Sequence, residues 1–370
     1  MHVDLPQTDV SASIKRKEIF MKTFIVIHLI VFISITAGLY GKTMAEEKKK
    51  EEPLYSSSLH YTGRGMAHWY DKANGGLESL TEIPYTNLPC YHCHVSSCDK
   101  CHQTKVNDRL LYSTEVARNQ KMCLECHQRE ASVQKIDQAA NQVDVHLAKG
   151  MRCMDCHTAR EMHGDGTEYD SMKQAGGMDA KCEKCHGSIT QSKSHTIHGD
   201  KLECKACHIR HVVSCSNCHF ETLLKEGKKV AIPVSGWVFL MNYNGKVTTA
   251  NMQTFVVTGN KTFLVFAPQN SHSIMKEGRK CEECHATEIV KKVQEGKLPL
   301  IWLEKGILNN LKGVIPVVKG ATYDAVYQNY KDGKWIAIEN PLAPVVHYAA
   351  YGEPLSKDQL QKLSMPMGEK

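Results

Sequence analysis

The sequence is short of aromatic residues, with only 8 Phe and 4 Trp among 370 residues. A protein of this length ordinarily fills its two or three cores partly with large rings, so this shortage predicts that something else occupies the interior. Gly and Pro are present at ordinary frequency and no long heptad run occurs, which excludes collagen, a coiled coil and a wholly disordered chain. Walker, dinucleotide-binding and GxSxG motifs are also missing, so the common nucleotide-binding and serine-hydrolase chemistries are not indicated.

No cysteine lies outside one repeated motif. All 16 form eight Cys-x-x-Cys-His units, so none remains for a disulfide or a free thiol. The cysteine pairs are Cys90 and Cys93, Cys98 and Cys101, Cys123 and Cys126, Cys153 and Cys156, Cys182 and Cys185, Cys204 and Cys207, Cys215 and Cys218, and Cys281 and Cys284. The histidines that follow them are His94, His102, His127, His157, His186, His208, His219 and His285.

This spacing predicts covalent haem attachment. Two thiols three positions apart lie on one side of a helical turn, where both can bond to the vinyl groups of one haem, and the adjacent histidine reaches the iron as the proximal ligand. Zinc ribbons and redox CxxC pairs are the rival interpretations, but neither needs a histidine after every second cysteine. The eight repeats therefore predict eight covalently bound haem c groups.

The number of haems sets the expected fold. Without residues 1–45, each haem has about 41 residues of chain, too few for eight separately folded modules. We therefore expect a mostly α-helical or irregular multihaem cytochrome c fold with a haem-filled core. Each motif should open a short helix.

Residues 228–268 break this pattern. Trp237, Phe239, Met241 and Tyr243 alternate with other residues and lead into Asn244-Gly245, a strong two-residue hairpin signal. The sequence predicts a small antiparallel β insert before the last haem. It could dock a partner, cover a haem edge or be purely structural. Further on, Thr287–Glu295 and the capping box at 356–359 predict short helices.

Ten histidines lie outside the motifs and the leader, enough to give eight irons a second axial ligand with two to spare. A single exposed histidine usually has no ligand role, but abundant haem iron reverses that expectation. The favoured distal ligands stand close to a motif in sequence: His146, His163, His198 and His272. His60, His68, His195, His211 and His347 are further candidates, and His92 is the weakest because it lies inside the first motif. Methionine is an alternative axial ligand.

The N-terminus carries an export signal. Thr23–Leu39 is an apolar run preceded by basic residues and followed by the small-x-small pattern Thr43-Met44-Ala45, which predicts a secretory signal peptide. An uncleaved N-terminal anchor is the alternative. The predicted layout is a leader (1–45), a charged linker (46–53), a seven-haem domain (54–227), the β-hairpin insert (228–268), an eighth haem-binding segment (269–296) and a C-terminal segment with short helices (297–370).

The spacing of the motifs indicates which haems are neighbours. Only Val95, Ser96 and Ser97 separate the first motif from the second, and the motifs at Cys204 and Cys215 are also close in sequence. We expect each of these pairs to bring two porphyrins together, as part of a continuous chain of haems that exchange electrons by tunnelling.

The formal charge of +6 could suggest a nucleic-acid partner. Two propionates on each of eight haems would outweigh this charge, so many Lys and Arg side chains should neutralise propionates. We expect no nucleic-acid partner.

The eight motifs and the stretch His-Leu-Ala-Lys-Gly-Met-Arg-Cys-Met-Asp-Cys-His at 146–157 resemble exported multihaem cytochromes c of anaerobic respiratory bacteria. That grouping includes hydroxylamine oxidoreductase, octahaem tetrathionate reductase, electron carriers and filament-forming cytochromes. The resemblance covers residues 90–285 and is specific for haem attachment rather than for one subfamily. The CxxCK motif typical of the catalytic haem in octahaem nitrite reductases does not occur.

The resemblance implies two alternative functions. One is an electron-transfer conduit with bis-histidine haems, which connects a membrane quinol oxidoreductase with periplasmic or outer-membrane cytochromes. The other is a haem-based oxidoreductase with one open iron that acts on nitrogen or sulfur oxyanions or on hydroxylamine. Both place the protein on the periplasmic or extracellular side of the cytoplasmic membrane. A membrane tether through residues 23–39 and a homo-oligomer or filament remain open.

Overall fold

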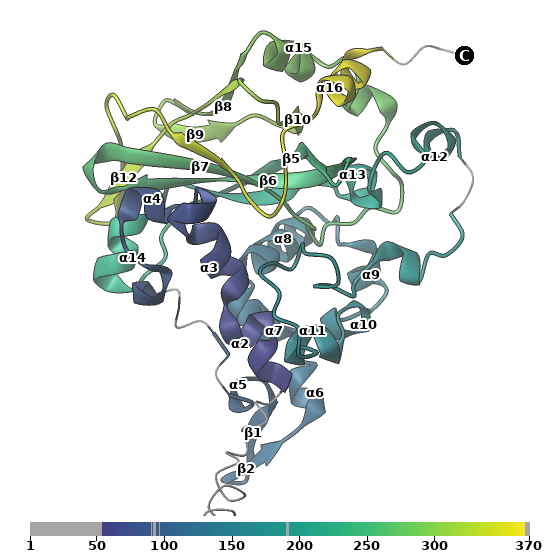
Figure 1. Cartoon of the computed structure of the whole chain (residues 1–370), viewed down its shortest axis with the longest axis vertical. Coiled ribbons are helices and arrows are strands. Elements are labelled where there is room, and N and C mark those ends of the chain that lie inside the picture. The colour runs from purple at the N-terminus through teal and green to yellow at the C-terminus, as the bar shows by residue number, and fades with distance from the viewer. Residues whose placement is uncertain (1–53, 90, 92–93, 96, 190–191, 367–370) are drawn as a thin grey trace, which may run out of the picture. The chain divides into compact units, whose positions relative to one another are not determined.

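The computed structural model describes residues 54–366 except 90, 92–93, 96 and 190–191. The expected leader and charged linker lie outside the described residues. The described part of the chain combines a group of short helices with an extensive β structure (Figure 1).

A seven-stranded sheet forms the centre of the β structure. Three long strands run as an antiparallel meander: β5 Ile232–Tyr243, β6 Lys246–Val257 and β7 Lys261–Pro268. β10 (Gly313–Pro316) adds in parallel to β5, and β14 (Val345–Tyr348) adds in parallel to β7. β3 (Val212–Ser216) pairs antiparallel with β5, and β4 (Cys218–His219) pairs in parallel with β6.

The β5–β6 turn lies at the predicted Asn244-Gly245 pair. Asn244 has φ 50° and Gly245 has φ 79°, the left-handed conformations that a two-residue hairpin turn matching the strand twist requires. Tyr243 pairs with Lys246 across the turn. The local sequence therefore dictates this hairpin.

The sheet has a hydrophobic core made of protein side chains. Trp237, Phe239 and Phe266 are at most 1% exposed and belong to one cluster. Val290 and Val293 of α15 (Glu288–Gln294) belong to the same cluster. Burial of such side chains contributes about 1.5–3 kcal/mol each. Protein side chains, including several of the few aromatics, thus fill this core.

The chain after residue 296 is mainly β structure. β8 (Lys297–Glu304) pairs with β9 (Ile307–Asn310) and β11 (Thr322–Ala325), while β12 (Gln328–Lys331) and β13 (Lys334–Ala337) form a separate antiparallel hairpin. α16 (Lys357–Ser364) begins at the predicted capping box, where Ser356 and Gln359 bond reciprocally. The expected short helices are thus only a small part of this segment.

Residues 54–227 contain mostly short helices, many of them capped by a Ser, Thr, Asn or Asp side chain, as expected for such turns. The α-helices are α2 Leu59–Thr62, α3 Arg64–Tyr70, α4 Glu78–Thr81, α5 Asp99–His102, α6 Thr114–Ala117, α7 Gln120–Cys126, α8 Gln128–Ala139, α9 Val145–Ala148, α10 Cys153–Cys156, α11 Ala159–His163, α12 Lys193–His198, α13 Cys204–His208 and α14 Phe220–Glu226. The 3-10 helices (η) of the described chain are η1 Leu54–Ser57, η2 Lys72–Asn74, η3 Tyr85–Asn87, η5 Cys182–Lys184, η6 Thr258–Asn260 and η7 Cys281–Glu283. β1 (Gln103–Val106) and β2 (Arg109–Tyr112) form an exposed hairpin.

A second hydrophobic cluster joins the first helices to the sheet. Tyr70 and Tyr85 from the N-terminal helices pack with Phe220 of α14 and with Phe263 of β7. No helix in the described ranges is both long enough and apolar enough to cross a membrane.

The expectation of a mostly helical or irregular fold with a haem-filled core and only a small β insert is wrong. The 228–268 segment forms the three longest strands of the central sheet, and β3 and β4 of the seventh motif belong to that sheet. The prediction failed because short strands far away in sequence join the hairpin by long-range pairing, which a local apolar pattern does not encode.

Candidate functional site

Six of the eight CxxCH motifs fold as a helical turn. In the second, third, fourth, fifth and eighth motifs, the backbone N–H of the histidine donates to the carbonyl of the first cysteine over 2.9–3.0 Å. The sixth motif is the helix α13 itself. A closed turn of this kind puts the two cysteines on one side, which is the arrangement that attachment to one haem requires.

The described cysteines form no disulfide. Thiols of successive motifs instead lie close together: Cys123 and Cys153 are hydrogen-bonded, and so are Cys182 and Cys204. This contact lowers the pKa of Cys123 to about 6, because the Cys153 thiol donates to its thiolate. The third motif therefore adjoins the fourth, and the fifth adjoins the sixth.

The pKa shifts of other cysteines extend this order. Burial raises the pKa of Cys101 of the second motif and of Cys156 of the fourth, and the nearby Cys123 of the third and Cys185 of the fifth, respectively, add to the rise. Burial likewise raises the pKa of Cys207 of the sixth motif, and Cys281 of the eighth adds to it. The motifs thus form one spatial series: second, third, fourth, fifth, sixth, eighth.

Six motif histidines each lie opposite a histidine from elsewhere in the chain. Their ring centroids are 5.9–6.4 Å apart. One iron bonded to Nε2 of two imidazoles at about 2 Å would separate the centroids by roughly 6 Å. The pairs are His102 with His163, His127 with His60, His157 with His272, His186 with His146, His208 with His195, and His285 with His198.

Carboxylates orient both rings of the His157–His272 pair. Glu161 Oε2 lies 2.7 Å from His157 Nδ1, and Glu130 Oε2 lies 2.9 Å from His272 Nδ1. Each Nδ1 therefore has a partner and each Nε2 is left for a metal. The hydrogen bond with Glu130 raises the pKa of His272. Burial raises the pKa of Glu130 and of Glu161, but several hydrogen bonds together outweigh it and lower both pKa values. Glu130 accepts from His272 and Gln269, and Glu161 accepts from His157 and from two backbone N–H groups.

Backbone carbonyls hold Nδ1 of three further paired histidines. His198 donates to Ser194 O at 2.9 Å, His285 to Lys362 O at 3.1 Å, and His208 to Met275 O at 3.2 Å. This choice of partner fixes the neutral tautomer with Nε2 as the free acceptor, which is the ligating form.

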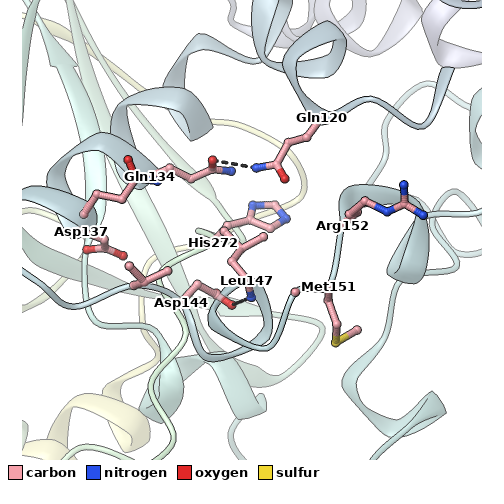
Figure 2. Close-up of a pocket in the computed structure, with 11 residues that line it drawn as sticks. Gln120, Gln134, Asp137, Asp144, Leu147, Met151, Arg152 and His272 are labelled. Atoms are coloured by element: carbon pink, nitrogen blue, oxygen red, sulfur yellow. Dashed lines mark hydrogen bonds between the residues drawn. The ribbon is translucent and has the colours of Figure 1, made fainter. Parts of the chain in front are cut away.

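A cavity of about 270 Å³ lies beside His272 and the start of the fourth motif (Figure 2). Its wall mixes polar and apolar side chains, and Gln120 donates to Gln134 Oε1 at 2.7 Å. Arg152, which precedes Cys153, lines the cavity together with the carboxylates of Asp137 and Asp144.

Three other predicted distal candidates lie elsewhere. His211 uses Nε2 for Asp137 Oδ1 at 2.8 Å, and His68 packs edge-on against Trp69. His347 is buried beside Trp69 and Phe263, and its Nε2 has no hydrogen-bond partner in the described chain. Within the described ranges, none of the three forms a ring pair with a motif histidine. His92 lies outside the described residues.

The first and seventh motifs differ from the other six. His94 lies against Tyr91 and Tyr85, with 3.3 Å between its Nε2 and Tyr85 Oη; Cys90 and Cys93 lie outside the described residues. The seventh motif is extended rather than helical, and its His219 faces Tyr330 with the ring centroids 6.4 Å apart.

The sequence interpretation missed the groups that hold the imidazoles. Glu161 follows His157 by four residues, so the (i, i+4) spacing could have identified it. Glu130 is 142 residues from His272, and Met275 is 67 residues from His208. No local signal encodes those two contacts.

Within the described residues, no group of three or more His, Cys, Asp and Glu side chains could hold a metal ion. A haem iron takes at most two ligands from the protein, so a pair of imidazoles is enough to complete its coordination.

Among curated proteins, the chain is similar to the dissimilatory sulfite reductase MccA of Wolinella succinogenes, with 25% identity over 217 residues. The match covers 49% of this chain and 30% of the relative, so the chain spans less than a third of that protein's length. No known protein-family profile matches the chain. No solved structure matches it either. With the CxxCH motifs, this distant similarity supports a haem-based redox role and gives distant support for the multihaem c-type cytochromes.

Proposed function

We propose that the chain is an octahaem c-type cytochrome that conducts electrons in extracytoplasmic respiration. Each CxxCH unit would hold one haem through two thioethers and bind its iron through the motif histidine. The haem supplies a one-electron Fe(III)/Fe(II) couple, and the chain supplies axial ligands, orientation and insulation from water.

The six imidazole pairs carry this proposal. A second histidine opposite the motif histidine would complete a six-coordinate, low-spin iron that changes little in geometry on reduction. We therefore propose His60, His146, His163, His195, His198 and His272 as distal ligands. The close thiols of neighbouring motifs support edge-to-edge haem contacts along the series from the second motif to the eighth.

The compartment and partners follow from the proposed role. Thioether attachment and the apolar leader are consistent with export to the periplasmic or extracellular side. We propose that redox proteins deliver and accept the electrons, with a membrane quinol oxidoreductase on one side and another cytochrome on the other.

A second candidate function is reduction of a sulfur or nitrogen oxyanion at one open haem. The observation that favours it is the similarity to a sulfite reductase. In this alternative the remaining haems would feed electrons to the open iron.

Haem content and spin state test the proposal. We expect eight covalent haems per chain from intact-protein mass and pyridine haemochrome absorbance, with at least six low-spin ferric haems by electron paramagnetic resonance. A chain that takes up no covalent haem when it is produced with a cytochrome c maturation system would overturn the proposal. Sulfite- or nitrite-dependent oxidation of the reduced protein would favour the second candidate function over a pure conduit.

A further inference from the structure

One loop lies along two haem attachment sites. Residues 273–279, called the strap below, follow His272 and lead into the eighth motif, which begins at Cys281. The strap is neither a helix nor a long strand, and its one regular pairing is an antiparallel bridge from Ile274 to Ile209, the residue after the sixth motif. Its position therefore depends on individual hydrogen bonds.

The strap is hydrogen-bonded to the sixth motif at several points. The backbone N–H of Met275 donates to His208 O over 2.8 Å, and the carbonyl of Met275 lies 3.2 Å from His208 Nδ1. The backbone N–H of Arg279 donates to Cys207 O over 3.0 Å. The strap therefore holds both the backbone and the imidazole of the proposed axial ligand.

The Arg279 side chain joins the sixth motif to the eighth. It is only 8% exposed. Its Nη2 donates to Ile209 O over 2.7 Å, directly after the sixth motif, and its Nη1 donates to Glu283 Oε2 over 3.3 Å, inside the eighth. A planar guanidinium holds two such acceptors in fixed directions, whereas the ammonium of a lysine is a single point on a flexible stem. One buried side chain thus relates the positions of the two motifs.

Gly278 leaves room beside the ligating nitrogen of His208. A Cβ atom on Gly278 would lie 3.6 Å from His208 Nε2 and 3.6 Å from Cys207 Cβ. An iron bonded to Nε2 lies about 2 Å from it, and the porphyrin extends from the iron to the thioether on Cys207. The space at Gly278 therefore borders the porphyrin. Gly278 is exposed and has no positive φ, so the protein alone would accept a side chain there, whereas a bound porphyrin would not.

We propose that the strap is a positioning element shared by the sixth and eighth haems, whose presence rests on the function proposed above. Gly278 forms the part of its wall that the sixth porphyrin contacts. Met275 orients His208, and Arg279 fixes the sixth site relative to the eighth. The geometry of these two haems therefore depends on the strap as well as on each attachment motif.

Gly278→Val in the holoprotein tests the contact with the sixth haem. We expect this variant to lose or shift one low-spin ferric signal in electron paramagnetic resonance, because the valine methyl groups would displace the porphyrin or His208. That signal should be the one that disappears in His195→Ala, since His195 lies opposite His208. Gly278→Ala should produce a smaller shift. Gly65→Ala, within α3 and without a positive φ, is the matched control and should leave every signal in place.

Arg279→Lys tests the connection to the eighth haem and keeps the charge. We expect two signals to shift: the one assigned through His195→Ala and the one that disappears in His198→Ala, since His198 lies opposite His285 of the eighth motif. Arg109→Lys, at an exposed position on β2, is the control and should leave both signals unchanged. A shift of only one signal in Arg279→Lys, or of neither, would overturn the shared role of the strap.

The outcomes separate the inference from the proposed function. A native spectrum in Gly278→Val would show that no porphyrin borders Gly278, which overturns the inference and leaves the electron conduit intact. A Gly278→Val chain that carries seven haems supports the inference if peptide mass analysis finds the sixth motif empty, and overturns it if another motif is empty. If Gly278→Val yields no folded holoprotein, the Arg279→Lys spectra decide. A native chain without covalent haem would instead overturn the proposed function.

Discussion

At the scale of single residues, the groups that hydrogen-bond to Nδ1 of the imidazoles determine which ring nitrogen is left to bind iron. Every CxxCH cysteine and histidine could be read from the sequence because attachment chemistry fixes their spacing. Some partners of Nδ1 could not, since Glu130 and Lys362 reach their histidines through tertiary contacts across 142 and 77 residues. The number of histidines indicated how many distal ligands were available. Only the three-dimensional structure distinguishes His146 and His198, which lie opposite motif histidines, from His211, which bonds to Asp137.

Replacement of a proposed distal ligand should change the spin state of one haem. We expect His146→Ala and His198→Ala each to convert one ferric haem from low to high spin, because each would leave one iron five-coordinate. Electron paramagnetic resonance and the absorbance bands of the holoprotein measure the change. His211→Ala is the control: it should leave the spin states unchanged, although it removes one of the two side-chain partners of buried Asp137 and should cost about 1–3 kcal/mol in stability. A high-spin haem in His211→Ala alone would reverse the ligand assignment.

Loss of the Glu130 charge should make one haem easier to reduce. The carboxylate increases the electron donation of His272, so Glu130→Gln should raise the potential of the haem it serves by roughly tens of millivolts. Spectroelectrochemical titration of the holoprotein would resolve the shift. Glu288→Gln removes a charge from a side chain that is 77% exposed and should leave the potentials as they are. Equal shifts in the two variants would show that overall charge, rather than the His272 contact, is responsible.

The Arg160–Asp179 pair should make stability depend on acid pH. A hydrogen bond from Arg160, 2.8 Å away, holds the pKa of Asp179 well below its unfolded value of about 3.9. This contribution is therefore complete above that unfolded pKa and is lost as the pH falls through the lower folded pKa. Arg160→Gln should lower the denaturant midpoint at pH 6, and the deficit relative to native protein should shrink toward pH 2. Lys319→Gln, at an exposed position, should produce no such trend, and a pH-independent deficit in Arg160→Gln would contradict the assignment.

At the scale of elements, local chemistry predicted turns and caps better than it predicted the sheet. The Asn244-Gly245 turn and the Ser356 capping box depend on residues within four positions of each other, so both could be derived from the sequence. β10 and β14 are four-residue strands that pair in parallel with distant partners. Their pairing depends on burial in the completed sheet, and the sequence alone therefore suggested only a small insert.

The β5–β6 turn should be sensitive to a side chain at its second position. Gly245 has φ 79° and open space around its Cβ position, so Gly245→Ala introduces backbone strain without a steric clash. We expect a loss of about 1 kcal/mol in the free energy of unfolding. Denaturant titration of the holoprotein measures it. Gly65→Ala, within helix α3 and without a positive φ, is the matched control and should be neutral or stabilising. An equal loss at both positions would argue against conformational strain at the turn.

At the scale of the whole molecule, sequence distance is a poor guide to which haem sites adjoin. The sixth and seventh motifs are neighbours in the chain, yet the sixth places Cys207 near Cys281 of the eighth and Cys204 against Cys182 of the fifth. The seventh motif is instead built into the sheet. The proposed electron path therefore follows tertiary contacts rather than the order of the motifs along the chain.

The C-terminal helix has a consequence for how the protein matures. Lys362 O accepts the hydrogen bond from Nδ1 of His285, and the next residue, Leu363, accepts one from the backbone N–H of Ala286. A chain synthesised only as far as β14 already carries both cysteines of the eighth motif, but it lacks the carbonyl that orients His285. Under the proposed function, haem attachment to this motif can therefore precede its final geometry, which is complete only once α16 packs beside it.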